Sequence, residues 1–181
     1  MYNFHGCLTS SFSKPDNYCE AIQWLLEEHP SLTKEMDQFR ETAAMLAYNP
    51  QREDRDELAK QLCMQIESFH KKLFLRAEKE EYLFDYVTKY VGNGSSPLTV
   101  MENEHIKVKE GLDKFFTKYS EGPGFTPEDV RELAYIAAGV FHTLTDHFLK
   151  EEEILFPFAE GLLNDEEKLA LLQKFHHSPA V

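Results

Sequence analysis

An internal repeat is the feature of this 181-residue chain that most constrains its fold. Two offsets, of 72 and 76 positions, each align a first copy with a second. The aligned segments are Phe69-His70 with Phe141-His142, 80–84 with 152–156, and Glu28-His29 with Glu104-His105. Each copy therefore has a segment with Glu-His followed by a segment with Glu-Glu-x-Leu-Phe. This pattern predicts two helix pairs with approximate twofold symmetry and an inward site shared between the halves.

Apolar residues keep helical spacing along most of the chain, and no segment alternates with period two, so the sequence predicts an all-α protein. We expect an irregular lead-in over 1–14, a four-helix bundle over 15–162, and a short helix and tail over 163–181. Asp16 is the expected N-cap of the first helix, and Pro30 predicts a kink or two abutting helices. The other expected helices cover 53–91, 98–119, 127–162 and 164–177. Short connections between long helices favour up-down-up-down topology.

Charge and composition exclude several classes of partner. The chain has 32 acidic and 19 basic residues, and the resulting charge of −13 argues against binding to nucleic acid or an anionic membrane. No apolar run has the length of a membrane span. Three widely spaced cysteines form neither a disulfide framework nor a metal-binding CxxC motif, so we expect a reducing cytoplasm. The sequence does not indicate an oligomeric state.

His147 and Glu151 form the pair that points most directly to chemistry. They are four residues apart, so on a helix they lie on one face, and that face is otherwise apolar. An imidazole and a carboxylate in a helix-packed core need a partner, because burying them without one is costly. A metal ion would supply it, and this donor set suits iron, manganese or zinc. The alternative is a surface histidine beside a glutamate-rich run.

The repeat adds His29 and His105 to this pair, since a twofold bundle would bring them to the same level. Glu104-His105 at a helix start, followed by the segment from His147 to Pro157, resembles the hemerythrin-like HHE cation-binding domain over about residues 18–165. The resemblance implies a four-helix bundle with a non-haem di-iron centre held by histidines and carboxylates. Members of this family bind oxygen, respond to iron or oxygen, or act in nitrosative stress and iron–sulfur repair.

The second helix departs from the family pattern, which repeats His-x-x-x-Glu there. The ungapped repeat places Leu75 and Lys79 at those positions, and neither side chain can bind a metal. The apolar stripe of the same helix instead favours Arg76 and Glu80 as the inward pair. The expected ligands are then His29, His105, His147 and Glu151, with Glu80 as a further candidate.

These ligands suffice to hold one metal ion but are too few for the usual coordination of two. In a second arrangement, Lys79 or Arg76 forms a buried ion pair with Glu151 and no metal binds. Two other possibilities involve different residues. His5 in the lead-in could fold back as an extra ligand. Glu67 and Glu102, each three residues before a histidine, match a ferritin-like motif, but they fall on consecutive rather than alternate helices.

The function expected from the sequence is a non-haem iron protein that binds or senses a small diatomic ligand such as oxygen or nitric oxide. One or two iron ions are expected, with manganese or zinc as substitutes. No nucleophile or general base is recognisable, so we do not expect an enzyme. The alternative hypothesis is a metal-free bundle that acts as an interaction or regulatory module, motivated by Leu75 and Lys79.

Overall fold

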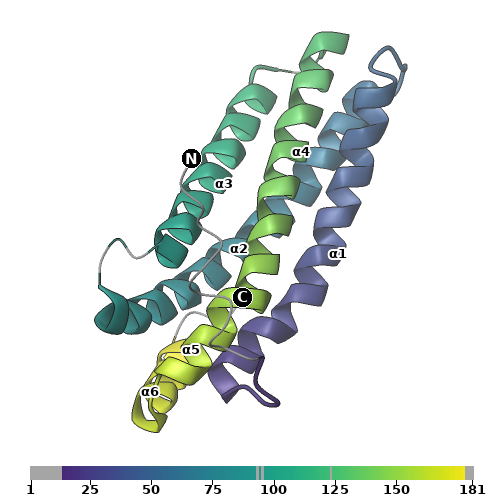
Figure 1. Ribbon diagram of the computed structural model, residues 1–181. Coiled ribbons are helices and arrows are strands. Elements are labelled where there is room, and N and C mark those ends of the chain that lie inside the picture. The colour runs from purple at the N-terminus through teal and green to yellow at the C-terminus, as the bar shows by residue number, and fades with distance from the viewer. Residues whose placement is uncertain (1–13, 93, 95, 123, 178–181) are drawn as a thin grey trace.

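The computed structural model describes residues 14–92, 94, 96–122 and 124–177, and all regular secondary structure in this part of the chain is helical. Four long helices are followed by a short π-helix and two shorter α-helices (Figure 1). Their bounds are α1 Glu20–Tyr48, α2 Arg55–Val91, α3 Ser96–Ser120, α4 Pro127–Lys150, η1 Glu151–Leu155, α5 Phe156–Leu162 and α6 Asp165–His177.

The four long helices form the expected bundle. Helix α4 packs against both α1 and α3, and α1 packs against α2 (Figure 1). The short helices α5 and α6 lie together at one end, where α6 contacts α1 and α2. The prediction of an all-α bundle with a short extra helix near the C-terminus is confirmed.

The start of the first helix differs from the prediction. Helix α1 begins at Glu20 with Cys19 as its N-cap, so Asp16 lies before the helix rather than capping it. The helix then continues through Pro30 as one element instead of forming two abutting helices. Leu25 and Leu32, on either side of Pro30, are both buried, and this packing holds the helix together across the hydrogen bond that proline cannot donate.

The fourth helix also differs, because it does not run unbroken to 162. Helix α4 ends at Lys150 and passes into the π-helix η1, which begins at Glu151 and leads directly into α5. A π-helix accommodates one extra residue within a helical run, and such insertions occur often at functional sites.

This extra residue explains the register of the repeat. Buried residues of α2 have counterparts in the second copy that lie 71 positions later as far as Glu151, at the start of η1, and 72 positions later from Leu155 onward. The pairs before it are Leu62 with Leu133, Ile66 with Ala137 and Phe69 with Val140; the later ones are Leu83 with Leu155, Phe84 with Phe156 and Val87 with Ala159. The 72-position alignment therefore holds only near the end of the repeat.

At the level of His147 the shorter offset applies, so the place of His147 is taken by Arg76 on α2. Glu80 likewise takes the place of Glu151, and both α2 residues are buried. Leu75, the residue that the ungapped alignment puts there, is only half-buried. The inward pair predicted from the apolar stripe of this helix is the one that the fold adopts.

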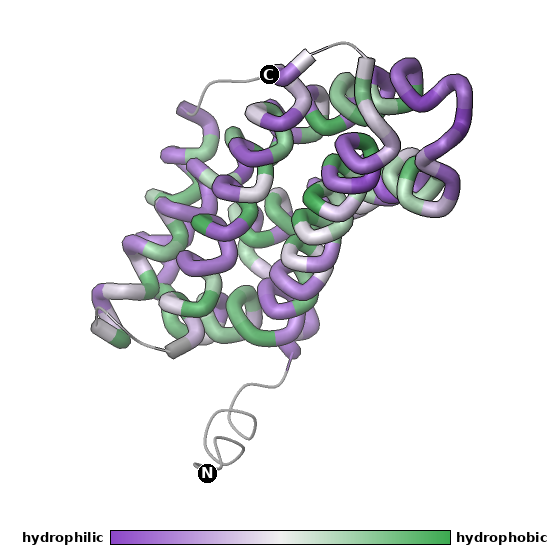
Figure 2. Tube along the Cα trace, turned by 90° about the horizontal axis from the view of Figure 1, so that it is seen from above, coloured by the Kyte–Doolittle hydropathy of each residue, from purple (hydrophilic) through white to green (hydrophobic). Residues whose placement is uncertain are grey.

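The core consists of two apolar clusters with a polar layer between them. One cluster surrounds Phe39, Phe69 and Phe115, and the other surrounds Ile22 and Phe156. Along every long helix, apolar and polar residues alternate around the turns (Figure 2). Within the described ranges, no helix combines the length and apolarity needed to cross a membrane.

Candidate metal centre

Buried polar side chains from all four long helices meet at one level of the bundle, between the two apolar clusters. On α1 this level falls between Leu25 and Leu32, and on α3 it falls between Met101 and Val108. The members of this polar layer are His29, Arg76, Glu80, Glu104, His105, His147 and Glu151. All of them except His105 are buried. The layer has two halves, which share the carboxylates of Glu80 and Glu151.

In the first half, Glu80, His105 and His147 bring three potential ligand atoms together. His105 Nε2 lies 2.9 Å from Glu80 Oε2 and 3.0 Å from His147 Nε2, and His147 Nε2 lies 3.7 Å from the same oxygen. Atoms that share a metal at about 2.0–2.2 Å are separated by about 2.8–3.1 Å in octahedral geometry and about 3.3–3.6 Å in tetrahedral geometry. The observed spacings are therefore close to the edges of a coordination polyhedron.

Glu151 adds a fourth donor atom to this half. Its Oε1 lies 3.7 Å from His147 Nε2. The side chain is fully buried, and this oxygen has no hydrogen-bond partner among the described residues. An orphaned carboxylate oxygen is unfavourable in such surroundings, and a cation would satisfy it. Two imidazole nitrogens and two carboxylate oxygens are a donor set that fits one iron, manganese or zinc ion.

His147 is oriented by a carboxylate from α3. Its Nδ1–H donates to Glu104 Oε2 at 3.1 Å, which turns Nε2 toward Glu80 and His105. Lys150 in turn pairs with the other oxygen of Glu104. A carboxylate behind a histidine is the usual arrangement for a metal-binding imidazole. Burial opposes protonation of His147, but the hydrogen bond to Glu80 and the charges of Glu151 and Glu80 raise its pKa to about 9.

The second half of the layer is occupied by the guanidinium group of Arg76. Its Nη2 donates to Glu151 Oε2 at 2.7 Å and to His29 Nε2 at 2.6 Å. Its Nε lies 2.5 Å from Glu80 Oε1, and its Nη1 donates to the carbonyl oxygen of Leu25 at 2.6 Å. Burial lowers the pKa of Arg76, but the charges of Glu151 and Glu80 outweigh that effect and raise it. The group is therefore a permanent buried cation.

Glu80 and Glu151 consequently join the two halves, with one oxygen of each carboxylate facing each side. Burial raises the pKa of Glu80, but the charge of Arg76 and the hydrogen bonds to His105 and His147 lower it well below its usual range. Glu80 is thus held as an anion, ready to bind a cation through Oε2.

His29 lies in the half that contains Arg76, away from the three-residue cluster. Its Nδ1–H donates to Glu152 Oε1 at 2.6 Å, so the Nε2 lone pair is free to accept from Arg76. Its ring stacks on Phe148 with centroids 4.5 Å apart. The structure therefore brings Glu80, His105, His147 and Glu151 together and places His29 on the other side of the shared carboxylates.

The other sequence candidates lie outside the layer. Lys79 pairs with Glu28 at its edge, so of the two cations proposed to pair with Glu151, Arg76 is the one that does so. Glu67 and Glu102 are both exposed, which removes the basis for a ferritin-like centre. His5 lies outside the residues that the structure describes.

Sequence reasoning missed Glu104 and Glu152 as partners of the site histidines. Glu104 was noted only as half of the repeated Glu-His pair, although it is buried and supports His147. The repetition of the Glu-His dipeptide was the feature of the sequence that could have indicated a role for Glu104. Glu152 could not be assigned to His29, because the π-helix determines which glutamate of the run 151–153 faces α1.

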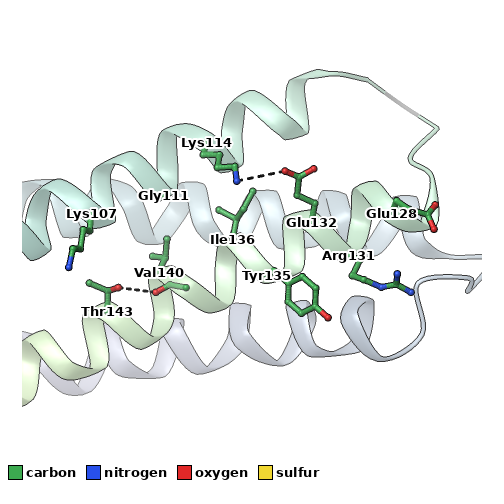
Figure 3. A pocket seen from close by; sticks show the side chains of 11 residues that line it. Lys107, Gly111, Lys114, Glu128, Arg131, Glu132, Tyr135, Ile136, Val140 and Thr143 are labelled. Atoms are coloured by element: carbon green, nitrogen blue, oxygen red, sulfur yellow. Dashed lines mark hydrogen bonds and ion pairs between the residues drawn. The ribbon is translucent and has the colours of Figure 1, made fainter.

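The surface pocket between α3 and α4 is separate from this centre. Figure 3 shows its lining, which includes Lys107, Lys114, Arg131 and Tyr135 and none of the polar-layer residues. Its walls carry no group of ligand atoms comparable to the three gathered by Glu80, His105 and His147.

Comparison with known proteins agrees with the geometry. No significant match was found among curated proteins, and none among solved structures. The family described as hemerythrin HHE cation binding domain matches residues 20–159, which include every residue of the polar layer. This chain belongs to the hemerythrin HHE cation-binding domain family.

Proposed function

We propose that this protein binds a single metal ion, most suitably iron, through Glu80, His105, His147 and Glu151, and that the bound ion takes up a small ligand such as oxygen or nitric oxide. The observation that carries the proposal is the convergence of three ligand atoms beside the orphaned Oε1 of buried Glu151. Family membership supports cation binding in general.

The residues divide the work between them. His105 and His147 would supply neutral nitrogen donors, and the two carboxylates would supply the negative charge that retains a divalent cation. Glu104 holds the ring of His147 in place. Four protein donors leave an octahedral ion with open positions, where an iron ion can bind oxygen or nitric oxide.

The polar layer would also control how a small ligand and water reach the bound ion. The His105 side chain is 24% exposed, whereas those of His147 and Glu80 are 2% exposed, so a small ligand would approach past His105. The aromatic ring of Phe84 stacks on His105 at 5.6 Å between centroids and limits this opening. Such apolar surroundings control solvent access and the potential of a bound ion.

The test is metal content after reconstitution with iron(II), manganese(II) or zinc(II) under nitrogen, measured by elemental analysis. We expect about one ion per chain in the unmodified protein. The metal content of His147→Ala should be much lower, because this variant lacks one of the metal ligands. His142→Ala is the matched control, since His142 is exposed on the same helix. Addition of nitric oxide to the iron(II) form should change its absorption spectrum, and His147→Ala should abolish that change.

Two outcomes would contradict the proposal. If His147→Ala retains the metal content of the unmodified protein, the cluster is not the site. If the unmodified protein takes up no ion, the metal-free interaction module becomes the better hypothesis, supported by the ion pairs that Arg76 already makes with both carboxylates.

A further inference from the structure

The two halves of the polar layer are related residue by residue. Each of the three side chains of the cluster has a counterpart at the corresponding place of the other half. These counterparts are His29 for His105, Glu151 for Glu80 and Arg76 for His147. Since two of the three pairs have the same residue type, the halves differ in one exchange, a guanidinium in place of an imidazole.

The supporting ion pairs repeat in the same way. Glu104 accepts from His147 and pairs with Lys150. Its counterpart Glu28 accepts from Arg76 and pairs with Lys79. These supporting ion pairs are alike in the two halves, and the presence of Arg76 in place of a histidine is the main difference in residue type between them.

The guanidinium lies where a metal ion of the second half would lie. It contacts His29 Nε2, Glu151 Oε2 and Glu80 Oε1, which are the counterparts of the atoms that converge in the first half. His29 Nε2 and Glu151 Oε2 are only 2.9 Å apart, although both act as acceptors toward Arg76. Both atoms contact the same Nη2 of Arg76, so the guanidinium bridges them as a shared cation would.

His29 is already held as a ligand would be. Its Nδ1–H donates to Glu152, which turns the lone pair of Nε2 toward the interior, and the residue is 4% exposed. A surface pocket bordered by His29, Pro30 and Glu152 reaches this half from solvent.

We propose that the Arg76 guanidinium is a resident cation that replaces the second metal ion of the layer, and that substitution of Arg76 by histidine opens a second ion site built on His29, Glu80 and Glu151. The inference rests on the proposed function for the number of ions in the unmodified protein. The second site itself depends only on the contacts around Arg76.

The experiment compares metal content and titration calorimetry of the unmodified protein, Arg76→His and the double variant Arg76→His/His29→Ala, with zinc(II) or cobalt(II) as the probe. We expect about one ion per chain in the first and about two in Arg76→His, since the variant restores the missing imidazole. The double variant should return to one. Cobalt(II) gives an absorption spectrum that reports the added nitrogen ligand.

Arg76→Met is the matched control, because it removes the guanidinium without adding a ligand; it keeps one ligand fewer than Arg76→His and should bind a second ion more weakly. A folded Arg76→His that gains no ion, or whose extra ion persists in the double variant, overturns the inference. If the unmodified protein binds none while Arg76→His gains one that depends on His29, the proposed function fails and this inference stands.

A measurement on the unmodified protein tests the inference without reliance on any variant. The Arg76 Nε–H signal in nitrogen-15 NMR should remain and stay protected from solvent exchange at saturating zinc(II), because the guanidinium keeps its buried partners. Uptake of two ions per chain with loss of that signal would overturn the inference.

Discussion

The two halves of the polar layer have nearly the same residues and opposite requirements. In the half with His147, imidazole nitrogens and carboxylate oxygens face one another, and Glu151 Oε1 has no hydrogen-bond partner in the described structure. In the half with Arg76, the guanidinium donates to His29 Nε2 and Glu151 Oε2 and forms an ion pair with Glu80. The two halves thus differ in one residue, which decides whether a half contains its own cation; under the proposed function, the other half takes one from solution. The following predictions run from the largest expected effect to the smallest.

Arg76→Met should destabilise the metal-free protein by about 3–5 kcal/mol, because it leaves two buried carboxylates without their cation. Urea unfolding followed by circular dichroism measures this loss. Lys72→Met is the control on the same helix. Lys72 pairs with Glu35, but its side chain is 42% exposed, so the cost should be about 1 kcal/mol or less.

Similar losses in the two variants would mean that the guanidinium contributes no more than a surface ion pair. The comparison between the halves would then lose its energetic basis, since Arg76 would not be acting as the resident cation of the buried carboxylates.

Glu104→Ala should weaken metal binding by about 10–100-fold, which corresponds to about 1.4–2.8 kcal/mol, because His147 loses the carboxylate that orients it. Its counterpart Glu28 contacts Arg76 and Lys79 instead, so Glu28→Ala should leave the metal affinity unchanged. Titration calorimetry of the folded variants measures both. Equal losses would show that the halves are not distinct in their metal binding.

The helix pairs α1–α2 and α3–α4 also differ in glycine content. Helices α3 and α4 each contain an interior glycine, and α1 and α2 contain none. A Cβ at Gly111 would lie 2.8 Å from Val140 Cγ2 (Figure 3), so Gly111→Ala should cost about 1–3 kcal/mol through overpacking. Gly139 has open space, and Gly139→Ala should stabilise by about 0.5–1 kcal/mol.

Thermal unfolding of the two variants checks this pair. Opposite shifts of the melting temperature are expected. A stabilising Gly111→Ala would mean that the close approach of α3 to α4 is not required for packing.

The sequence by itself determined the class of fold and the level of the site. Apolar residues at helical spacing and the repeated Glu-His and Glu-Glu-x-Leu-Phe segments predict a symmetric bundle, because a helix buries one face and a repeat places equal faces at equal depth. His105, His147 and Glu151 are found at the predicted level. The apolar stripe of α2 also indicated Arg76 and Glu80 as an inward pair, against the ungapped repeat.

Only the tertiary structure decided between those alternatives and divided the predicted ligands into two halves. One residue corresponds to about 100° around an α-helix, so a single insertion changes which side chain faces inward. The π-helix at Glu151–Leu155 is such an insertion, and the apolar spacing of the sequence did not predict it. His29 was separated from His105 and His147 for a related reason: the long side chain of Arg76 reaches the shared carboxylates and takes the position beside His29.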